Sequence, residues 1–330
     1  MIRNLPLALP AALAALALPL PAIAQDAPSP NQIVAEANAE EWVRIAPEDL
    51  LVMTLDPDRD GDTREVVIQL MPEPLSQGWV ANIRTLARAG WYDGISVNRV
   101  QDNYVVQWGD PNYDNPEAEG AAKALPEGLR VMDESDYVDV VRAAEPGDDK
   151  IVLWHPRPDL RDIYAESATF SKGWPIGIAT TPDTKAVTRW LVHCYGMVGV
   201  GRGMSPDTGS GAELYTVIGH APRHLDRNIA LVGRVVLGIE HLSSLPRGSG
   251  ALGFYTSEEA DERTLILSIR VASDLPAAEQ PEFEYLSTES ETFARYAEAR
   301  ANRRDPFFIV PAGGADICNI PVPVRATPAE

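Results

Sequence analysis

Arg99 and Gln107 are the polar side chains of this chain that are best placed to do chemistry. They lie on two short strand-like runs, residues 95–100 and 104–108, which a turn at residues 101–103 joins into a predicted hairpin. Arginine stays charged and offers a rigid fork of N–H donors, so a fixed guanidinium can stabilise a polar transition state. Taken alone, Arg99 is better explained as a surface arginine on a strand. A catalytic role for it has to be supported by the residues around it.

Other patterns that are typical of catalytic or cofactor sites are incomplete in this chain. The glycine-rich run at residues 199–203 lacks the G-x-G-x-x-G spacing, and there is no G-x-S-x-G nucleophile elbow. His220 and His224 are four residues apart, but Pro222 between them argues against one helical face that binds zinc. We therefore expect no cofactor and no metal.

An acidic loop at residues 56–64 begins like an EF-hand calcium loop. The matching residues are Asp56, Asp58, Asp60 and Gly61. The twelfth position, which should be a bidentate glutamate, is Val67, and the flanking runs 50–55 and 65–70 have the composition of strands rather than helices. A solvated hairpin turn is the better interpretation.

Length and charge exclude one large class of function. A chain of 330 residues that is 45% hydrophobic and 23% charged can bury a full core. Its formal net charge of -20 argues against a nucleic-acid groove, because phosphate binding needs concentrated Lys and Arg. We predict a globular protein that does not bind nucleic acid.

The N-terminus has the features of a secretory signal. Arg3 gives a positive start, residues 5–21 are an apolar run, and residues 22–24 have the small-x-small form of a cleavage site before Gln25. A membrane anchor is the alternative, but the four prolines of this segment disfavour a spanning helix. We therefore expect residues 1–24 to be removed, leaving a periplasmic protein without a membrane anchor.

Cys194 and Cys318 are the two cysteines of the chain. In an oxidising compartment they can close a disulfide across a long loop, for which the chain-entropy model gives about 4 to 5 kcal/mol. Two buried free thiols are the alternative, and the sequence does not decide between them. The absence of a C-x-x-C motif excludes a thiol redox motif.

Residues 76–89 form a predicted amphipathic helix between the two pairs of strand-like runs. Ile83 and Leu86 share its apolar face, Ser76 can cap its start, and Gly90 can end it in the left-handed conformation. Two strands, a helix and then a hairpin favour an antiparallel sheet closed on itself over a parallel sheet.

Residues 66–110 resemble the N-terminal half of a cyclophilin-type peptidyl-prolyl cis/trans isomerase. The predicted helix leads into A-R-A-G-W-Y-D-G, and V-N-R-V-Q-D-N-Y-V-V-Q-W-G-D stands where the family has F-H-R-x-x-P-x-F-x-x-Q-x-G-D. The positions that match or nearly match are Arg99, Tyr104, Gln107, Gly109 and Asp110. The positions that differ are Val97, Asn98, Asp102 and Trp108.

The resemblance implies a role for Arg99. Rotation about an X-Pro bond crosses a barrier of roughly 18 to 20 kcal/mol that comes from amide resonance. A guanidinium held against the prolyl nitrogen favours the single-bond-like transition state without a nucleophile, metal or cofactor. In the family, the position of Gln107 helps to hold the arginine and the substrate backbone, and that of Tyr104 belongs to the wall of the proline pocket.

Residues 193–245 resemble the second cyclophilin block, which runs from a Gly-rich loop through S-Q-F-F-I and W-L-D-G to V-F-G-x-V and a second helix. The departures are Arg202 for an asparagine, Glu213 for the glutamine, His224 for the tryptophan and Ile229 for a pocket histidine. We expect Glu213 to be able to pair with Arg99, and Arg202 to offset that charge. The implied substrate-binding residues are Tyr104, Val105, Gly201, Arg202, Glu213, Tyr215, His224, Leu225 and Ile229.

Two segments lie outside this resemblance. Residues 111–192 are predicted as an insertion with short segments at 135–143 and 150–154. We expect the tryptophans of this stretch to pack it onto the barrel, with an exposed aromatic binding surface as the alternative. They are Trp154, Trp174 and Trp190.

Near the C-terminus, a helix opening at Thr288 is predicted. Final strands are predicted at residues 307–310 and 316–323, and Cys318 would lie on the last of them.

We therefore predict a mainly β protein, a closed eight-stranded antiparallel barrel capped by two helices, with a large insertion and an extra C-terminal helix. A leader at residues 25–48, flexible over 25–36, would precede the domain at 49–330. The expected function is isomerisation of proline-containing polypeptide segments during the folding of exported proteins. The alternative is a barrel that has lost turnover and binds such segments or an envelope partner.

Overall fold

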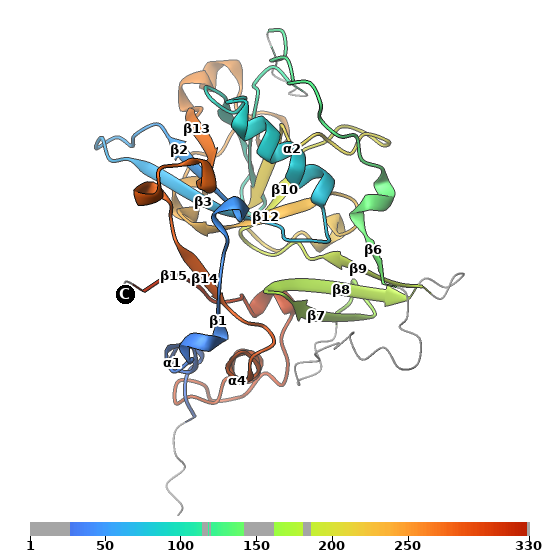
Figure 1. Ribbon diagram of the computed structural model, residues 1–330, viewed down its shortest axis with the longest axis vertical. Helices are drawn as coiled ribbons and strands as arrows, with labels where there is room; N and C mark the ends of the chain where they lie inside the picture. The colour runs from blue at the N-terminus through green and yellow to red at the C-terminus, as the bar shows by residue number, and fades with distance from the viewer. Residues whose placement is uncertain (1–26, 114–117, 119, 142–161, 181–185, 329–330) are drawn as a thin grey trace, which may run out of the picture.

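The centre of the computed structural model is an eight-stranded sheet in the order β13-β2-β3-β12-β10-β11-β5-β4, in which neighbouring strands are antiparallel (Figure 1). The structure describes residues 27–113, 118, 120–141, 162–180 and 186–328. The strands are β2 Leu50–Leu55, β3 Arg64–Leu70, β4 Ser96–Val100, β5 Val105–Gly109, β10 Met197–Val200, β11 Leu214–Val217, β12 Leu231–Leu237 and β13 Ile266–Val271. A bridge between Ser96 and Leu265 brings the two edges together, so the sheet is nearly closed into a barrel, as predicted.

The first hairpin forms where the sequence predicts it, and both of its faces are buried. Side chains alternate across a strand, so Leu51 and Met53 enter the main core, whereas Leu50 and Val52 pack in a second cluster on the outer face. The acidic loop between β2 and β3 is the turn of this hairpin. In it, Asp58 Oδ1 accepts the N–H groups at positions 60 and 62, each at 2.9 Å.

Two helices cover the barrel, as predicted. Helix α2 (Gln77–Arg88) contacts β12 and β13, and α3 (Ile239–Ser243) contacts β3. Gly90 takes the expected left-handed conformation with φ 62°. The predicted cap at Ser76 is wrong, because this residue is itself left-handed and its hydroxyl accepts no capping bond. In the described part of the chain, no helix is both long and apolar enough to cross a bilayer.

The insertion builds a four-stranded sheet of its own, in the order β6-β9-β8-β7. Its strands are β6 Asp139–Val141, β7 Ser167–Ser171, β8 Trp174–Thr180 and β9 Val187–Leu191. Trp174 and Trp190 are buried under Arg234 and Arg227, with guanidinium carbons 4.5 and 4.6 Å from the ring centroids. These two tryptophans therefore pack the insertion onto the barrel, as predicted. The segment expected at 150–154, with Trp154, lies outside the described residues.

The two ends of the chain together form a third layer beside the barrel (Figure 1). Strand β1 (Trp42–Arg44) pairs with β14 (Phe283–Leu286), which pairs with β15 (Val324–Ala326), and α1 (Pro30–Ala35) contacts α4 (Glu291–Ala301). The prediction of a flexible leader over residues 25–36 is wrong where the structure describes it. Residues 30–35 are helical, and Ile33 packs in the main core.

The predicted C-terminal helix is found as α4, but its start and the segments after it differ from the expectation. Ser290, not Thr288, caps it by accepting the N–H of Phe293. The expected strands at 307–310 and 316–323 are wrong. The first is an exposed irregular segment, and the second contains a short 3-10 helix, Ile317–Asn319. The last strand of the barrel is β13, not a strand that carries Cys318.

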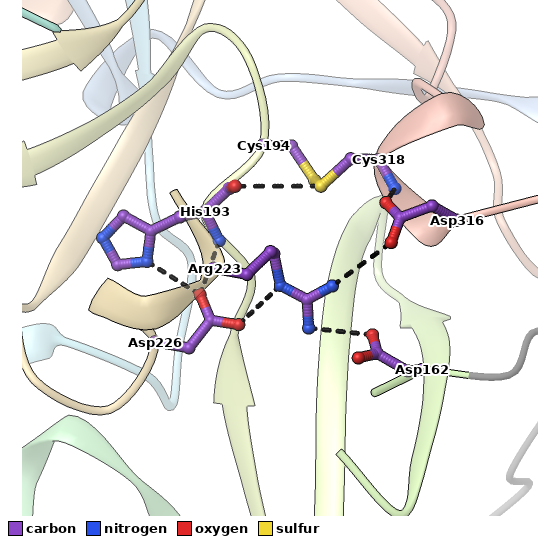
Figure 2. The surroundings of a disulfide bond; sticks show 7 residues. All are labelled: Asp162, His193, Cys194, Arg223, Asp226, Asp316 and Cys318. Carbon is purple, nitrogen blue, oxygen red and sulfur yellow. Dashed lines mark hydrogen bonds and ion pairs between the residues drawn. A yellow bond between two sulfur atoms is a disulfide. The ribbon is translucent and has the colours of Figure 1, made fainter. Parts of the chain in front are cut away.

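Of the two states that the sequence leaves open for the cysteines, the structure shows the disulfide. Cys194, just before β10, is bonded to Cys318 in the 3-10 helix Ile317–Asn319, with an S–S distance of 2.04 Å (Figure 2). The bond spans 124 residues of sequence and ties the C-terminal layer to the barrel.

Replacing both cysteines with serine should lower the free energy of unfolding by about 3 to 5 kcal/mol, because a long closed loop restricts the unfolded chain. Urea unfolding followed by tryptophan fluorescence measures this loss, and wild-type protein in reductant should show a similar one. Unfolding midpoints that coincide for the oxidised protein and the double variant would contradict the prediction.

Candidate active site

An open cavity of about 410 Å³ lies on the barrel beside the β4–β5 hairpin. Every residue of the predicted site lines it except His224. These residues are Arg99, Tyr104, Val105, Gln107, Gly201, Arg202, Glu213, Tyr215, Leu225 and Ile229. Strand pairing explains this convergence, because β5 lies between β4 and β11 in the sheet. His224 is exposed and stacks on the ring of Tyr104 with centroids 6.3 Å apart, so it supports the rim of the cavity.

The guanidinium of Arg99 is held from three sides. Its Nε donates to the carbonyl oxygen of Leu252 at 2.7 Å, and Nη1 donates to Gln107 Oε1 at 3.2 Å. Nη2 donates to Gln101 Oε1. These bonds use three of the five N–H donors of an arginine, one on each nitrogen. Each terminal nitrogen therefore keeps one further N–H for a ligand.

Two aromatic rings flank this guanidinium. Its central carbon lies 5.6 Å from the ring centroid of Tyr104 and 5.5 Å from that of Phe254. Burial lowers the pKa of Arg99, while the nearby Tyr104 and Tyr215 act in the opposite direction. Arginine nevertheless stays protonated at neutral pH, so the cavity contains a fixed cation in a partly dry setting, where electrostatic interactions are strong.

Part of this arrangement could not be found from the sequence motifs. Leu252 and Phe254 follow the barrel strand β12 by many residues, and Tyr113, Gly203 and Met204 also line the cavity. The glycines of the segment 248–253 are the signal that indicates a tight turn there, since Gly253 has φ 83° and its added Cβ would lie 2.8 Å from the backbone of the hairpin turn. Such a signal predicts a turn but not its contact with Arg99.

The expected ion pair between Glu213 and Arg99 is wrong. Glu213 is buried, and its Oε1 accepts the backbone N–H of Asp110 at 2.9 Å. A Cβ at Gly109 would lie 1.9 Å from that same oxygen, so the carboxylate occupies space that only glycine leaves free. Among the ion pairs of the described residues, none joins Glu213 to Arg99.

Arg202 also binds the backbone. Its Nε and Nη2 donate to the carbonyl oxygen of Asn228 at 3.0 and 2.9 Å, and Nη1 donates to that of Gly203 at 2.8 Å. Arg202 therefore holds two loops of the cavity together, whereas we expected it to offset the charge of Glu213.

Tyr215 forms the cavity floor where the resembled motif has phenylalanine. Its hydroxyl is 2.8 Å from His193 Nε2, and His193 Nδ1 is 2.9 Å from Asp226 Oδ1. A neutral imidazole protonated on Nδ1 satisfies both bonds, with the tyrosine hydroxyl as donor. Gly199 provides the room, because a Cβ there would lie 2.3 Å from that hydroxyl. The hydroxyl is thus bonded within the barrel wall.

Arg223 extends this network away from the cavity (Figure 2). Its Nε pairs with Asp226 Oδ2 at 2.7 Å, and Nη2 pairs with Asp162 Oδ2 at 2.8 Å. Nη1 lies 3.7 Å from Asp316 Oδ2, two residues before the disulfide-bonded cysteine of the C-terminal layer. One buried cation therefore joins the loop at residues 222–229, which lines the cavity, to the insertion and to the C-terminal layer.

The buried His193 should make stability depend on pH. Burial lowers the pKa of His193 below its ordinary value of 6.5, and the hydrogen bond to Asp226 only partly opposes this. In the window below pH 6.5, the unfolded chain binds a proton that the folded protein excludes. The contribution is therefore present above about pH 6.5 and is lost as the pH falls. The free energy of unfolding, measured with urea between about pH 5 and 8, should depend less steeply on pH for His193→Gln than for wild type. The same dependence of the free energy of unfolding on pH in the two proteins would contradict this.

Comparisons with known proteins identify the family of this chain. A family model described as cyclophilin type peptidyl-prolyl cis-trans isomerase/CLD matches residues 60–271, more than half of the chain. Peptidyl-prolyl cis-trans isomerase B of Bacillus subtilis (strain 168) is 27% identical over 115 residues, which are 34% of this chain and 80% of that protein.

One solved structure shows the same fold. Cyclophilin AquaCyp293 from Hirschia baltica has a TM-score of 0.62 at 23% sequence identity, and the match covers 89% of this chain and 100% of that one. A cyclophilin type isomerase from Cryptosporidium parvum, crystallised in the presence of the dipeptide Ala-Pro, is more distant, with a TM-score of 0.36 and 11% identity over 67% and 96% of the two chains. From the family match, the chain belongs to the cyclophilin-type peptidyl-prolyl cis-trans isomerases.

Proposed function

We propose that this protein isomerises X-Pro bonds in unfolded or newly translocated chains in the periplasm, with Arg99 as the electrostatic catalyst. The observation that carries the proposal is the guanidinium of Arg99, fixed by Gln107, Gln101 and the Leu252 carbonyl at the edge of an open cavity. Family membership gives the reaction class, and the fixed cation gives a means of catalysis.

The catalytic step requires stabilisation of a twisted amide. Twisting removes resonance, so the lone pair returns to the prolyl nitrogen, which becomes a hydrogen-bond acceptor. An N–H of Arg99 can donate to this nitrogen in the twisted state but not in the planar ground state, and this difference lowers the barrier. Because the guanidinium is already fixed, little reorganisation is needed when the bond twists.

The floor of the cavity suits the substrate proline. Val105 and Tyr215, which line the cavity, form a small apolar cluster with Val217 behind them, and Tyr104 and Ile229 pack against it. A pyrrolidine ring gains from burial on such a surface. Gln107 accepts from Arg99 through Oε1, so its amide NH₂ can donate to a substrate carbonyl.

A binding module without turnover is the second candidate. It is favoured by the exposed His224 at the rim, where the resembled motif has tryptophan, and by two arginines that line one cavity. Such a module would keep the affinity for proline-containing segments and would lack the rate enhancement.

Arg99→Ala should reduce kcat/KM for isomerisation by about 10²- to 10³-fold, as loss of one fixed transition-state donor does elsewhere. A proline-limited refolding assay on the mature protein measures it. Arg88→Ala is the control, because Arg88 is a half-exposed arginine on α2 whose partners are Glu48 and Asp274. Refolding rates that are equal in wild type and Arg99→Ala would support the binding module instead.

The full chain, expressed in a Gram-negative bacterium, should be found in the periplasmic fraction with an N-terminus near Gln25. The reason is the apolar run and cleavage pattern of residues 1–24. N-terminal sequencing of the fractionated protein checks this. An uncleaved chain in the membrane or cytoplasmic fraction would contradict export to the periplasm with removal of residues 1–24.

A further inference from the structure

A second cavity, of about 330 Å³, lies between the barrel, the insertion sheet and the C-terminal layer. Most of its lining is apolar. The lining side chains include Phe170, Met197, Val235, Ile320, Pro321 and Val322. Its size is at the lower end of the range for small-molecule sites. The disulfide lies in its wall, since both Cys194 and Cys318 contribute to the lining.

Arg234 of β12 also lines this cavity, and its side chain is incompletely satisfied. The residue is 7% exposed. Its Nε donates to Gln69 Oε1 and its Nη1 to the Gly173 carbonyl, both at 2.8 Å. Among the described residues, Nη2 has no hydrogen-bond partner and no carboxylate pairs with the guanidinium.

An unpaired guanidinium in this position is unusual, because buried charges are normally paired. The rings of Trp174 and Tyr285 lie 4.5 and 5.8 Å from its central carbon, and their attraction for the cation offsets only part of the cost of burying its charge. Burial lowers the pKa of Arg234 to about 10, so it remains a cation at neutral pH.

The positive charge of the cavity lining indicates that the partner of the Arg234 guanidinium would be an anionic group. Besides Arg234, the described lining includes Arg300 and contains no aspartate or glutamate. Arg300 is held at the Asn319 carbonyl, at the cavity wall. In a chain with a net charge of -20, two arginines and no acid around one apolar cavity are a local reversal of the overall charge.

We propose that this cavity binds a carboxylate carried on a short apolar body, with the carboxylate on Arg234 and the body against the apolar walls. A planar carboxylate matches the fork of an arginine. Two sources share this chemistry, a free medium-chain fatty acid and the C-terminus of a polypeptide that ends in an apolar residue. The site is separate from the isomerase cavity, because no residue lines both.

Isothermal titration of the mature protein with octanoate and with octanamide tests the proposal. Octanoate should bind at least tenfold more tightly, because only it pairs with the guanidinium. The peptide Ala-Ala-Leu and its amide form a second arm. If neither octanoate nor the peptide Ala-Ala-Leu binds more tightly than its own amide, the proposal is overturned. If carboxylate selectivity is seen for one probe pair alone, that pair identifies the source, and in either case the site is supported.

The variant Arg234→Met should weaken octanoate binding at least tenfold. Arg227→Met is the matched control, because Arg227 also stacks on a buried tryptophan but does not line the cavity. Its affinity for octanoate should match that of wild type, and equal weakening in both variants would count against the site.

Two further variants keep the test decisive if Arg234→Met does not fold. Arg300→Gln should weaken octanoate binding about two- to fivefold, and unchanged affinity would contradict the proposed lining. Arg99→Ala should leave octanoate affinity unchanged while it reduces isomerase activity. Loss of octanoate binding in Arg99→Ala would place the ligand in the isomerase cavity and would overturn the second site.

Discussion

The immobilised guanidinium of Arg99 is the constraint on which this site depends. A flexible arginine would have to be ordered during each catalytic event, and its electrostatic benefit would be smaller. Here the two glutamines of the hairpin and one carbonyl from residue 252 hold it in place. Because residue 252 follows β12 and residue 99 lies on β4, this contact exists only when the barrel has nearly closed.

The charged residues that depart from the family pattern form hydrogen bonds with backbone groups of the barrel and its loops. Glu213 accepts a backbone N–H, and Arg202 donates to two backbone carbonyls. The carboxylate of Glu213 therefore does not draw the guanidinium away from its other partners, and Arg202 holds two loops instead of offsetting that carboxylate. The hydroxyl of Tyr215 is likewise bonded to His193 in the barrel wall. These contacts explain how a cavity with altered residues keeps a fixed cation above an apolar floor.

The added parts of the chain are coupled to this cavity as well. Arg223 pairs with carboxylates from the cavity loop, the insertion and the C-terminal layer, and a disulfide lies beside it (Figure 2). A buried cation with several acidic partners is costly to separate from any of them. The insertion and the terminal layer therefore support the loop that carries Leu225 and Ile229.

Local patterns predicted the hairpin and α2, because alternation and helical periodicity are recorded in adjacent residues. Most of the lining of the cavity was predicted from the resemblance of two sequence blocks to the cyclophilin family. Contacts between distant segments were not predictable in this way. The contact of Phe254 with Arg99 and the backbone bond of Glu213 depend on barrel closure. The helix at residues 30–35 was missed although Ser29 and Gln32 form a capping box and Pro30 stands at its first position, because a short polar segment with prolines also fits a flexible leader.

Exchange spectroscopy by NMR on an Ala-Pro peptide, with catalytic amounts of the mature protein, tests the role of Arg99 most directly. It measures the cis/trans interconversion itself while the peptide remains at equilibrium. Arg99→Lys keeps the charge but loses the fork that three acceptors hold. We expect a large loss of catalysed exchange in Arg99→Lys, with peptide binding retained. Exchange rates that are equal in wild type and Arg99→Lys would contradict it.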